Sequence, residues 1–364
     1  MESKAIMTDN HISKISSVNP MGTDGFEFVE YASADPSSLE SLFKGFGFTA
    51  IAKHCSKNIT LYRQGDINFI VNREPESFAS RFQTQHGPSA CSFGIRVEDA
   101  VYAHRRAMQL GYESGTSELG DFPAIVGIGG CLIYLIDGYG DKGSMYNEEF
   151  IPFEGVDQNP EGLGLTFIDH ITHNVYQGNM DKWASYYEDL FNFREIRYFD
   201  IEGKLTGLKS RAMTSPCGKV RIPINESSDD KSQIEEYLQQ YNGEGIQHIA
   251  LNSIDIYQSV HNMRDLETRF MTPPPDTYYE MLPARLPWHQ EDVQRMKDSA
   301  ILMDGVPTKE GGLLLQIFTE TAIGPIFFEI IQRKGDEGFG EGNFKALFES
   351  MERDQIRRGV LKDK

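Results

Sequence analysis

The sequence has few cysteines, and none of them are grouped. Its 364 residues include 4 cysteines, at positions 55, 91, 131 and 217, without any Cys-x-x-Cys pair. This usage is not typical of a disulfide framework or of a zinc site. Cys91 and Cys131 lie in apolar, strand-like runs, so we expect both to be small buried hydrophobic residues.

Positive charge is also scarce. The chain has 35 Lys and Arg against 54 Asp and Glu, which gives a formal net charge of −19, and no long basic cluster offsets this excess. A nucleic-acid backbone or an anionic membrane surface attracts positive charge. We therefore expect no nucleic-acid and no membrane partner. A small anionic substrate remains compatible with this composition, because it meets only the local field of its pocket.

Long hydrophobic runs are missing as well. The most apolar C-terminal stretch, residues 313–331, is interrupted by Gln316, Glu320, Gly324, Pro325 and Glu329, so it predicts two strands and not a membrane helix. The first 14 residues contain no apolar core of signal-peptide length. We expect a cytoplasmic, reducing location.

The order of predicted elements occurs twice along the chain. Short runs with a period of two, which predict strands, alternate with amphipathic helices in residues 20–150 and again in residues 165–335. The stretch 148–164, rich in Gly, Pro and acidic residues, joins the two halves. The pattern predicts an α+β fold with a flexible tail (1–19), an N-terminal domain (20–155) and a C-terminal domain (156–364).

Two segments do not fit this repeat. Residues 272–305 begin with a Pro cluster and show little periodicity at their start, and such a segment within a compact domain is usually functional or a docking element. Residues 343–359 predict a helix with one apolar face, formed by Phe344, Leu347, Phe348 and Met351. We expect the glycines of 334–344 to place this helix as a lid.

Three polar residues interrupt apolar strands in the second half: His170 in FIDHITHNV, His248 in GIQHIAL and Glu329 in IFFEIIQ. A buried polar group without a partner costs about 1–3 kcal/mol. A hydrogen bond in the core would satisfy any one of them alone. Two imidazoles and one carboxylate at matching places on three strands are instead typical of the facial triad of non-haem Fe(II) sites, which leaves neighbouring coordination positions open.

His173 is an alternative to His170. It lies three residues further on, so in a strand its side chain faces the opposite side. His170 shares its face with Thr166, Ile168 and Thr172. The pattern alone gives His170 only a slight advantage.

The first half lacks this trio. Aligning ACSFGIRVED with IQHIALNSID places Ser92 opposite His248, and aligning LIYLID with FFEIIQ places Tyr134 opposite Glu329. In GFEFVEY, Glu27 is nearest to the first histidine of the trio. We therefore expect both halves to keep the fold and only the second to keep the metal site. A shift of one residue would turn a side chain to the other face.

Further polar residues accompany the strands of the second half. Amides and hydroxyls suit the recognition of a phenol or a carboxylate, since they offer donors and acceptors at little desolvation cost. A role as ordinary surface or cap residues is equally expected for Gln233 and Ser210, but less so for Gln316, which apolar residues flank. The candidates are Ser210, Asn225, Gln233, Gln247 and Gln316.

These residues and their surroundings resemble the 4-hydroxyphenylpyruvate dioxygenase family of the vicinal-oxygen-chelate superfamily. The most specific strings are FIDHITHNVY, NGEGIQHIAL, PPPDTYYEML, LLLQIFTET and the long stretch from GPIFFEIIQRK to RDQIRRG. The resemblance covers nearly the whole chain. It implies two tandem βαβββ half-barrel domains of glyoxalase/dioxygenase type, of which only the C-terminal one is catalytic, with a C-terminal lid helix. It also implies a homodimer or homotetramer.

The resemblance also implies the site. Fe(II) would be held by His170, His248 and Glu329, and Asn225, Gln247 and Gln316 would act in catalysis. The implied substrate pocket comprises Ser210, Pro223, Asn225, Gln233, Gln247, Gln316, Phe318, Phe339, Asn343 and Phe344, with Phe348 closing it.

The implied activity is the conversion of 4-hydroxyphenylpyruvate and O₂ to homogentisate and CO₂, in tyrosine and phenylalanine catabolism or in pigment formation. Three alternatives remain open. A 4-hydroxymandelate synthase uses the same substrate and triad, extradiol ring cleavage can also use two His and one Glu, and a binding protein on this fold would lack turnover. Metal content distinguishes the binding protein, which should purify without stoichiometric iron.

Overall fold

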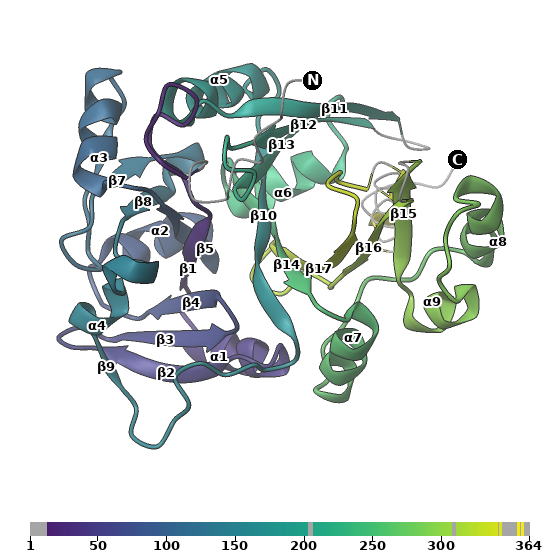
Figure 1. Cartoon of the computed structure of the whole chain (residues 1–364), viewed down its shortest axis with the longest axis horizontal. Helices are drawn as coiled ribbons and strands as arrows, with labels where there is room; N and C mark the ends of the chain where they lie inside the picture. The colour runs from purple at the N-terminus through teal and green to yellow at the C-terminus, as the bar shows by residue number, and fades with distance from the viewer. Residues whose placement is uncertain are drawn as a thin grey trace, which may run out of the picture.

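Two curved β-sheets, one from each half of the chain, form the framework of the molecule (Figure 1). The computed structural model describes residues 13–202, 207–307, 311–340, 342–343, 355–356 and 358–359. In spatial order the first sheet contains β6 (Ser114–Gly115), β7 (Ala124–Val126), β8 (Leu132–Ile136), β5 (Ser89–Arg96), β1 (Phe26–Ala32), β4 (Ile67–Asn72), β3 (Ile59–Gln64), β2 (Thr49–His54) and β9 (Phe150–Pro152). The second contains β11 (Arg194–Glu202), β12 (Gly207–Thr214), β13 (Arg221–Ser227), β10 (Leu165–Val175), β14 (Gly245–Ser253), β17 (Phe327–Lys334), β16 (Gly312–Phe318) and β15 (Leu302–Val306).

The two sheets correspond strand by strand. The parallel pair β1–β4 matches β10–β13, and the parallel pair β5–β8 matches β14–β17. The antiparallel pair β1–β5, which joins the two parts of the first sheet, matches β10–β14. The predicted α+β fold with two tandem half-barrels is therefore confirmed.

The helices begin at the polar residues that the sequence places before them. The side chain of Asp99 accepts a hydrogen bond from the backbone N–H of Tyr102, and Ser232 and Asp255 cap two later helices in the same way. The helices are α1 (Pro36–Gly45), α2 (Phe78–His86), α3 (Ala100–Gln109), α4 (Met145–Glu149), α5 (Met180–Phe191), α6 (Gln233–Tyr241), α7 (Ile256–Asp265), α8 (Asp276–Arg285) and α9 (Val293–Ser299).

Each sheet has one face in a shared core and one face toward its own interior. The shared core joins Tyr31 and Phe69 of the first sheet with Ile171 and Phe328 of the second. The interior of the first half-barrel is filled by a separate apolar cluster that includes Phe28. The alternation of side chains along a strand therefore decides which residues face each interior.

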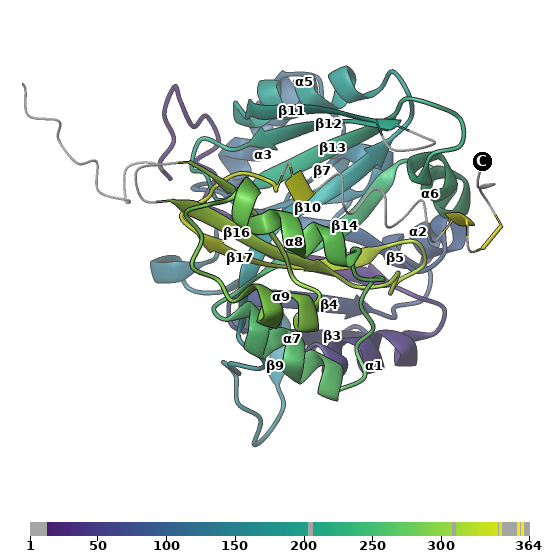
Figure 2. The ribbon, with the colours of Figure 1, turned by 90° about the vertical axis from the view of Figure 1, so that its right-hand side faces the viewer.

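Two stretches that the sequence left without strands contribute to the sheets. In the joining stretch 148–164, β9 pairs with β2 and so extends the first sheet. Residues 272–305 contain α8, α9 and the edge strand β15, which pairs with β16. Figure 2 views the second sheet from the side on which α7, α8 and α9 lie.

The N-terminal tail is anchored over its described part. The backbone N–H of Ile15 donates to Glu98, and the amide of Asn192 donates to the carbonyl of Val18. Asn19 is buried and hydrogen-bonded to Thr23. Residues 13–19 were expected to be loose, and these contacts to distant parts of the chain, which no local pattern shows, hold them in place.

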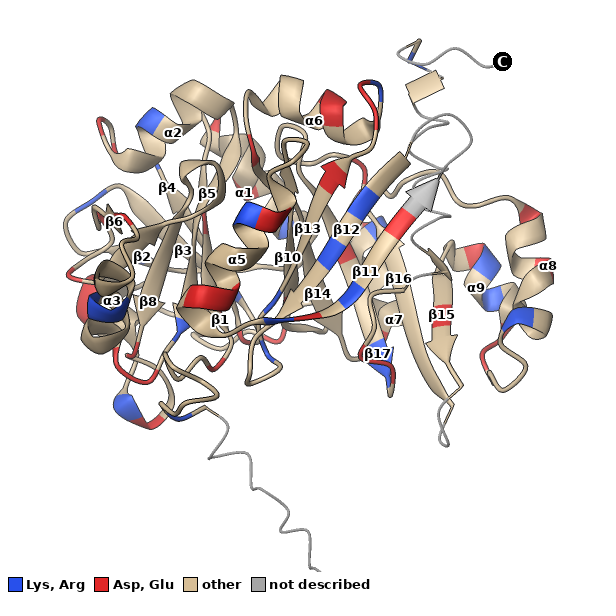
Figure 3. Cartoon of the chain, turned by 90° about the horizontal axis from the view of Figure 1, so that it is seen from above, with Lys and Arg blue, Asp and Glu red and all other residues tan. Residues whose placement is uncertain are grey.

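Lys and Arg, and Asp and Glu, occur in both halves of the chain in the view of Figure 3. On β12, for example, Arg211 pairs with Asp181 of α5 and Glu195 of β11. Among the described residues, no helix is long and apolar enough to cross a membrane.

Candidate metal centre and substrate pocket

Three neighbouring strands bring His170, His248 and Glu329 together. His248 lies on β14, between β10, which carries His170, and β17, which carries Glu329. The Nε2 atoms of the two histidines are 3.3 Å apart, and Glu329 Oε2 lies 3.2 Å from the first and 3.4 Å from the second. All three side chains are buried. The predicted trio therefore meets at one point inside the second half-barrel.

His173 lies on the other side of β10. It is fully buried, and its ring is 6.1 Å from that of Phe93 in the first half. Burial lowers its pKa to about 3, so it stays neutral in the core. The choice of His170 over His173 thus follows from the alternation along the strand.

The electrostatics of the trio favour a cation. Burial alone would raise the pKa of Glu329, but His170 and His248 outweigh it and lower this pKa to about 2. Burial lowers the pKa of His248, whereas for His170 the carboxylates of Glu329 and Asp169 outweigh burial and raise the pKa. An ionised carboxylate and two imidazole nitrogens within ligand distance of one another form the donor set of a two-His, one-carboxylate metal site.

Both imidazoles are oriented by partners behind them. Asp169 Oδ1 lies 2.9 Å from His170 Nδ1, and Gln247 Oε1 lies 2.9 Å from His248 Nδ1. An acceptor at Nδ1 favours a proton there, so that Nε2 keeps its lone pair for a metal. Gln316 Nε2 donates to Glu329 Oε1 over 2.8 Å, which leaves Oε2 toward the histidines.

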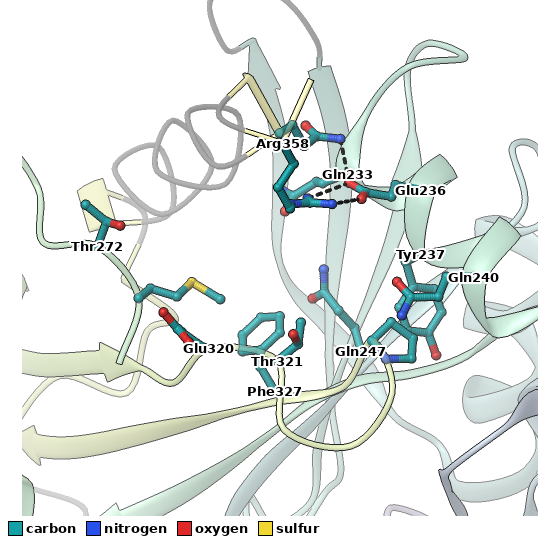
Figure 4. Close-up of a pocket in the computed structure, with 13 residues that line it drawn as sticks. Gln233, Glu236, Tyr237, Gln240, Gln247, Thr272, Glu320, Thr321, Phe327 and Arg358 are labelled. Carbon is teal, nitrogen blue, oxygen red and sulfur yellow. Dashed lines mark hydrogen bonds and ion pairs between the residues drawn. The ribbon is translucent and has the colours of Figure 1, made fainter. Parts of the chain in front are cut away.

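Two cavities lie beside the trio. The smaller, of about 20 Å³, contains the trio itself and is lined by Ser210, Pro223, Gln316, Phe318 and Phe339 of the predicted substrate pocket. The larger, of about 390 Å³, is lined by Gln233 and Gln247 together with residues of the C-terminal segment (Figure 4). This larger cavity could accept a small aromatic acid. Gln247 lines it and also contacts His248 of the trio.

Several predicted pocket residues carry polar atoms without a partner among the described residues. These atoms are Ser210 Oγ, Asn225 Oδ1 and Gln233 Oε1, and all are buried. Asn225 Nδ2 lies 3.3 Å from Gln247 Oε1, which links two of the amides. An unpaired buried acceptor or donor costs about 1–3 kcal/mol, so these atoms are suited to a polar ligand.

The remaining predicted pocket residues are only partly visible. The amide of Asn343 lies 2.9 Å from Gln316 Oε1, so it belongs to the network that holds Glu329. Phe344 and Phe348 lie outside the described residues, as does most of the predicted lid helix. Of that segment, Gln355 and Arg358 are described, and both contact Glu236 of α6 at the rim of the larger cavity (Figure 4).

The sequence did not single out three residues that contact the site. Phe199 lines the smaller cavity, and Asp169 and Arg333 form a buried pair behind His170. A signal was present for Asp169, a charged residue among buried residues of β10, but not for Arg333, which lies at the partly exposed end of β17. Their pairing joins positions 164 residues apart, and no local pattern reports such a contact.

The register of the first half shows what replaces the trio. Ser92 pairs with Glu30 as His248 pairs with Thr172, so Ser92 occupies the position of His248. Gly94 pairs with Tyr134 as Ala250 pairs with Glu329, so Tyr134 occupies the position of Glu329. Both predicted equivalences are confirmed.

The third predicted equivalence, of Glu27 with His170, is wrong. Phe28 pairs with Gly94 as His170 pairs with Ala250, so Phe28 occupies the place of the histidine. Both ladders shift at the same place, between Phe26 and Phe28 in the first half and between Ile168 and His170 in the second, so the two strands stay aligned residue by residue. Glu27 therefore corresponds to Asp169.

A second group of possible metal ligands lies in the first half. His54 is buried, Cys55 is exposed, and Glu149 Oε2 lies 3.5 Å from His54 Nε2. The backbone N–H of Ser56 donates to His54 Nδ1, which places the proton of the neutral ring on Nε2, toward Glu149. Glu149 lies within ion-pair distance of this nitrogen but forms no hydrogen bond with it among the described residues, and the exposed Cys55 sets this group apart from the fully buried trio.

Comparisons with known proteins are consistent over nearly the whole chain. A family profile described as "Hydroxyphenylpyruvate dioxygenase, HPPD, N-terminal" matches residues 17–151. A second, described as "Glyoxalase/Bleomycin resistance protein/Dioxygenase superfamily", matches residues 167–284. The first range covers the first half-barrel, and the second covers β10 to β14 of the second half-barrel but ends before β15, β16 and β17.

Individual relatives extend these matches. A protein named "Hemolysin VllY" from Vibrio vulnificus is 59% identical over 356 residues, which are 95% of this chain and 99% of the relative. A 4-hydroxyphenylpyruvate dioxygenase from a Pseudomonas species is 57% identical over 352 residues, 94% of this chain and 98% of the relative. Among solved structures, a mutant of 4-hydroxymandelate synthase from Streptomyces coelicolor has a TM-score of 0.79 and 23% identity, over 92% of this chain and 99% of its own, which is a likeness of fold.

Proposed function

Because the chain belongs to the 4-hydroxyphenylpyruvate dioxygenase family, we propose that its second half-barrel carries out that family's reaction. The protein is a metal-dependent dioxygenase that converts 4-hydroxyphenylpyruvate and O₂ to homogentisate and CO₂. The observation that carries this assignment to a particular site is the meeting of His170, His248 and Glu329 inside one half-barrel, beside a cavity with unpaired polar atoms.

Fe(II) is the metal that we propose for this centre, with His170, His248 and Glu329 as its ligands. Two imidazole nitrogens and one ionised carboxylate fit it, and the acceptors behind the rings direct both Nε2 atoms inward. When bound, Fe(II) supplies open coordination positions at which O₂ and the 2-oxo acid group of the substrate can react.

The protein residues bind and orient the substrate. Ser210 Oγ, Asn225 Oδ1 and Gln233 Oε1 have no hydrogen-bond partner in the described part of the chain, and we propose that they and Gln247 recognise the phenol hydroxyl through hydrogen bonds. The rings of Phe318 and Phe339 line the smaller cavity, where they exclude water from the reacting ring. On the other side, Gln316 donates to the carboxylate of Glu329, and Asn343 lies against Gln316.

A product analysis tests the proposal. Metal-free protein is incubated with Fe(II), 4-hydroxyphenylpyruvate and O₂, and the aromatic product is identified by chromatography. Homogentisate is the expected product. 4-Hydroxymandelate would keep the metal centre but overturn the proposed orientation of the substrate, and the absence of any product with metal bound would overturn the assignment of the reaction.

Location and assembly extend the proposal. We propose that the enzyme acts in the cytoplasm and as a homodimer or homotetramer. Light scattering of the purified protein tests the assembly, and a monomer would contradict it.

A further inference from the structure

A buried carboxylate lies directly behind the first metal ligand. Asp169 is fully buried, and its Oδ1 lies 2.9 Å from His170 Nδ1. Arg333 lies against this carboxylate, with Nε 2.7 Å from Asp169 Oδ2 in a buried ion pair. Asp169 is thus a charged acceptor, whereas the corresponding partner of His248 is the neutral amide of Gln247.

One arginine holds this carboxylate and the aromatic wall of the pocket together. Arg333 Nε and Nη2 each donate to Asp169 over 2.7 Å. Its Nη1 donates to the carbonyls of Asp336 and Gly338, over 3.1 and 2.6 Å. Phe339 follows that turn, and its ring lies 5.4 Å from the ring of His170.

We propose that Asp169 and Arg333 are positioning residues that couple the metal ligand to the pocket wall. Asp169 accepts the proton of His170 Nδ1 and so directs Nε2 toward the metal. Arg333 fixes the plane of the Asp169 carboxylate with two hydrogen bonds and, with its third nitrogen, fixes the turn that presents Phe339. This inference rests on the proposed metal centre.

The first half contains a matched pair without a histidine. Glu27 corresponds to Asp169 by register, is buried, and accepts a hydrogen bond of 2.5 Å from Arg96 Nε. The residue after it is Phe28, which has no nitrogen to orient. In the first half, the buried acid–arginine pair therefore only stabilises the fold. In the second half, the acid of the pair also contacts the proposed metal ligand His170.

The experiment compares Asp169→Asn with Glu27→Gln. Metal-free proteins are titrated anaerobically with Co(II), whose visible spectrum reports coordination, and their Tm values are measured without metal. An amide at position 169 can donate to Nδ1 and favours the wrong tautomer, so we expect the Co(II) affinity to fall about 10–100-fold. Glu27→Gln should lower the Tm but leave the affinity unchanged. Equal affinities for Asp169→Asn and wild type would overturn the inference.

Two further measurements keep the inference testable if Asp169→Asn does not fold. Arg333→Lys keeps the positive charge but loses the paired guanidinium hydrogen bonds to Asp169 and those to the turn before Phe339. Because that turn is then held less firmly, KM for the substrate should rise by a larger factor than kcat falls. An unchanged KM would contradict the claim that Arg333 couples the metal ligand to Phe339. In the Zn(II)-loaded wild type, ¹⁵N NMR should show a proton on His170 Nδ1 and the metal on Nε2, and the reverse would overturn the proposal.

The result can be separated from a failure of the proposed function. A wild type that binds neither Co(II) nor Fe(II) would overturn both. A wild type that binds metal and forms homogentisate, beside an Asp169→Asn variant with the same affinity, would overturn the positioning role alone.

Discussion

The two half-barrels share a strand order and differ in what fills them. In the first, Phe28, Ser92 and Tyr134 stand where His170, His248 and Glu329 stand in the second. Phe28 and Tyr134 pack into an apolar cluster that closes the interior of the first half. In the second half the same three positions line a cavity of about 20 Å³. The framework is therefore common to both halves, and a few inward positions separate a core from a reaction site.

The comparison also shows how a buried acid is stabilised without a metal. Glu30 of β1 pairs with Ser92 as Thr172 pairs with His248, so Glu30 lies close to the place of the absent metal. Its Oε1 accepts from Asn72 over 2.7 Å and its Oε2 accepts from Ser92 over 2.5 Å. Hydrogen bonds from its own sheet thus satisfy this carboxylate, whereas Glu329 faces two imidazoles.

The largest expected effect comes from removing a ligand. His248→Ala should abolish tight metal binding and turnover, because the metal then has only two protein ligands. Anaerobic Fe(II) titration and O₂ consumption measure both. The matched control is Ser92→Ala, at the same place in the first half, which should leave both unchanged. Turnover in His248→Ala would remove the centre from the second half.

A smaller effect is expected in the pocket. Asn225→Ala should lower kcat/KM, because substrate groups lose a buried partner. The ratio of the wild-type and variant kcat/KM values should correspond to a loss of about 1–3 kcal/mol of transition-state stabilisation. Asn72 is its register equivalent and hydrogen-bonds to Glu30. Asn72→Ala should lower the Tm and leave kcat/KM unchanged. Steady-state kinetics measure both values. An equal loss of kcat/KM in the two variants would contradict the claim that only the second half binds the substrate.

The pH dependence of stability tests the buried acid of the first half. Burial raises the pKa of Glu30 above its ordinary value of 4.5, although Ser92 and Asn72 oppose this. The native state then holds the proton more tightly than the unfolded state, so this contribution to stability is complete below the ordinary pKa and is lost as the pH rises through the raised one. Glu30→Gln, which cannot ionise, should therefore gain Tm relative to wild type as the pH rises. A constant difference across the pH series would show that Glu30 does not titrate in this way.

The smallest effect is expected at Tyr134. Its hydroxyl accepts a long hydrogen bond of 3.4 Å from the backbone N–H of Glu118. Tyr134→Phe keeps the ring in the apolar cluster, so the free energy of unfolding should fall by about 1 kcal/mol or less. Denaturant unfolding measures this change, and homogentisate formation should be unaffected. A loss of activity would mean that the first half contributes to the reaction.

The sequence predicted what depends on local pattern. Period-two runs gave most strands, and the polar residues within them gave the metal trio, including His170 over His173 with the help of the family resemblance. The place of Glu27 was missed because strings aligned without their neighbouring strands can slip by one residue, and only the pairing of β1 with β5 and of β10 with β14 fixes the register. The Asp169–Arg333 pair was missed because it joins strands that only the folded sheet brings together. The edge strand β15 was missed because its short segment, LMDGV, contains Asp and Gly.

The most direct test of the account is the number of Fe(II) ions bound by each chain. Anaerobic titration of metal-free wild type, Ser92→Ala and His248→Ala provides this number. We expect one tightly bound Fe(II) per chain in wild type and in Ser92→Ala, and none in His248→Ala. Tight binding that survives in His248→Ala, or a second tight site that Ser92→Ala removes, would contradict the claim that the second half-barrel alone holds the metal.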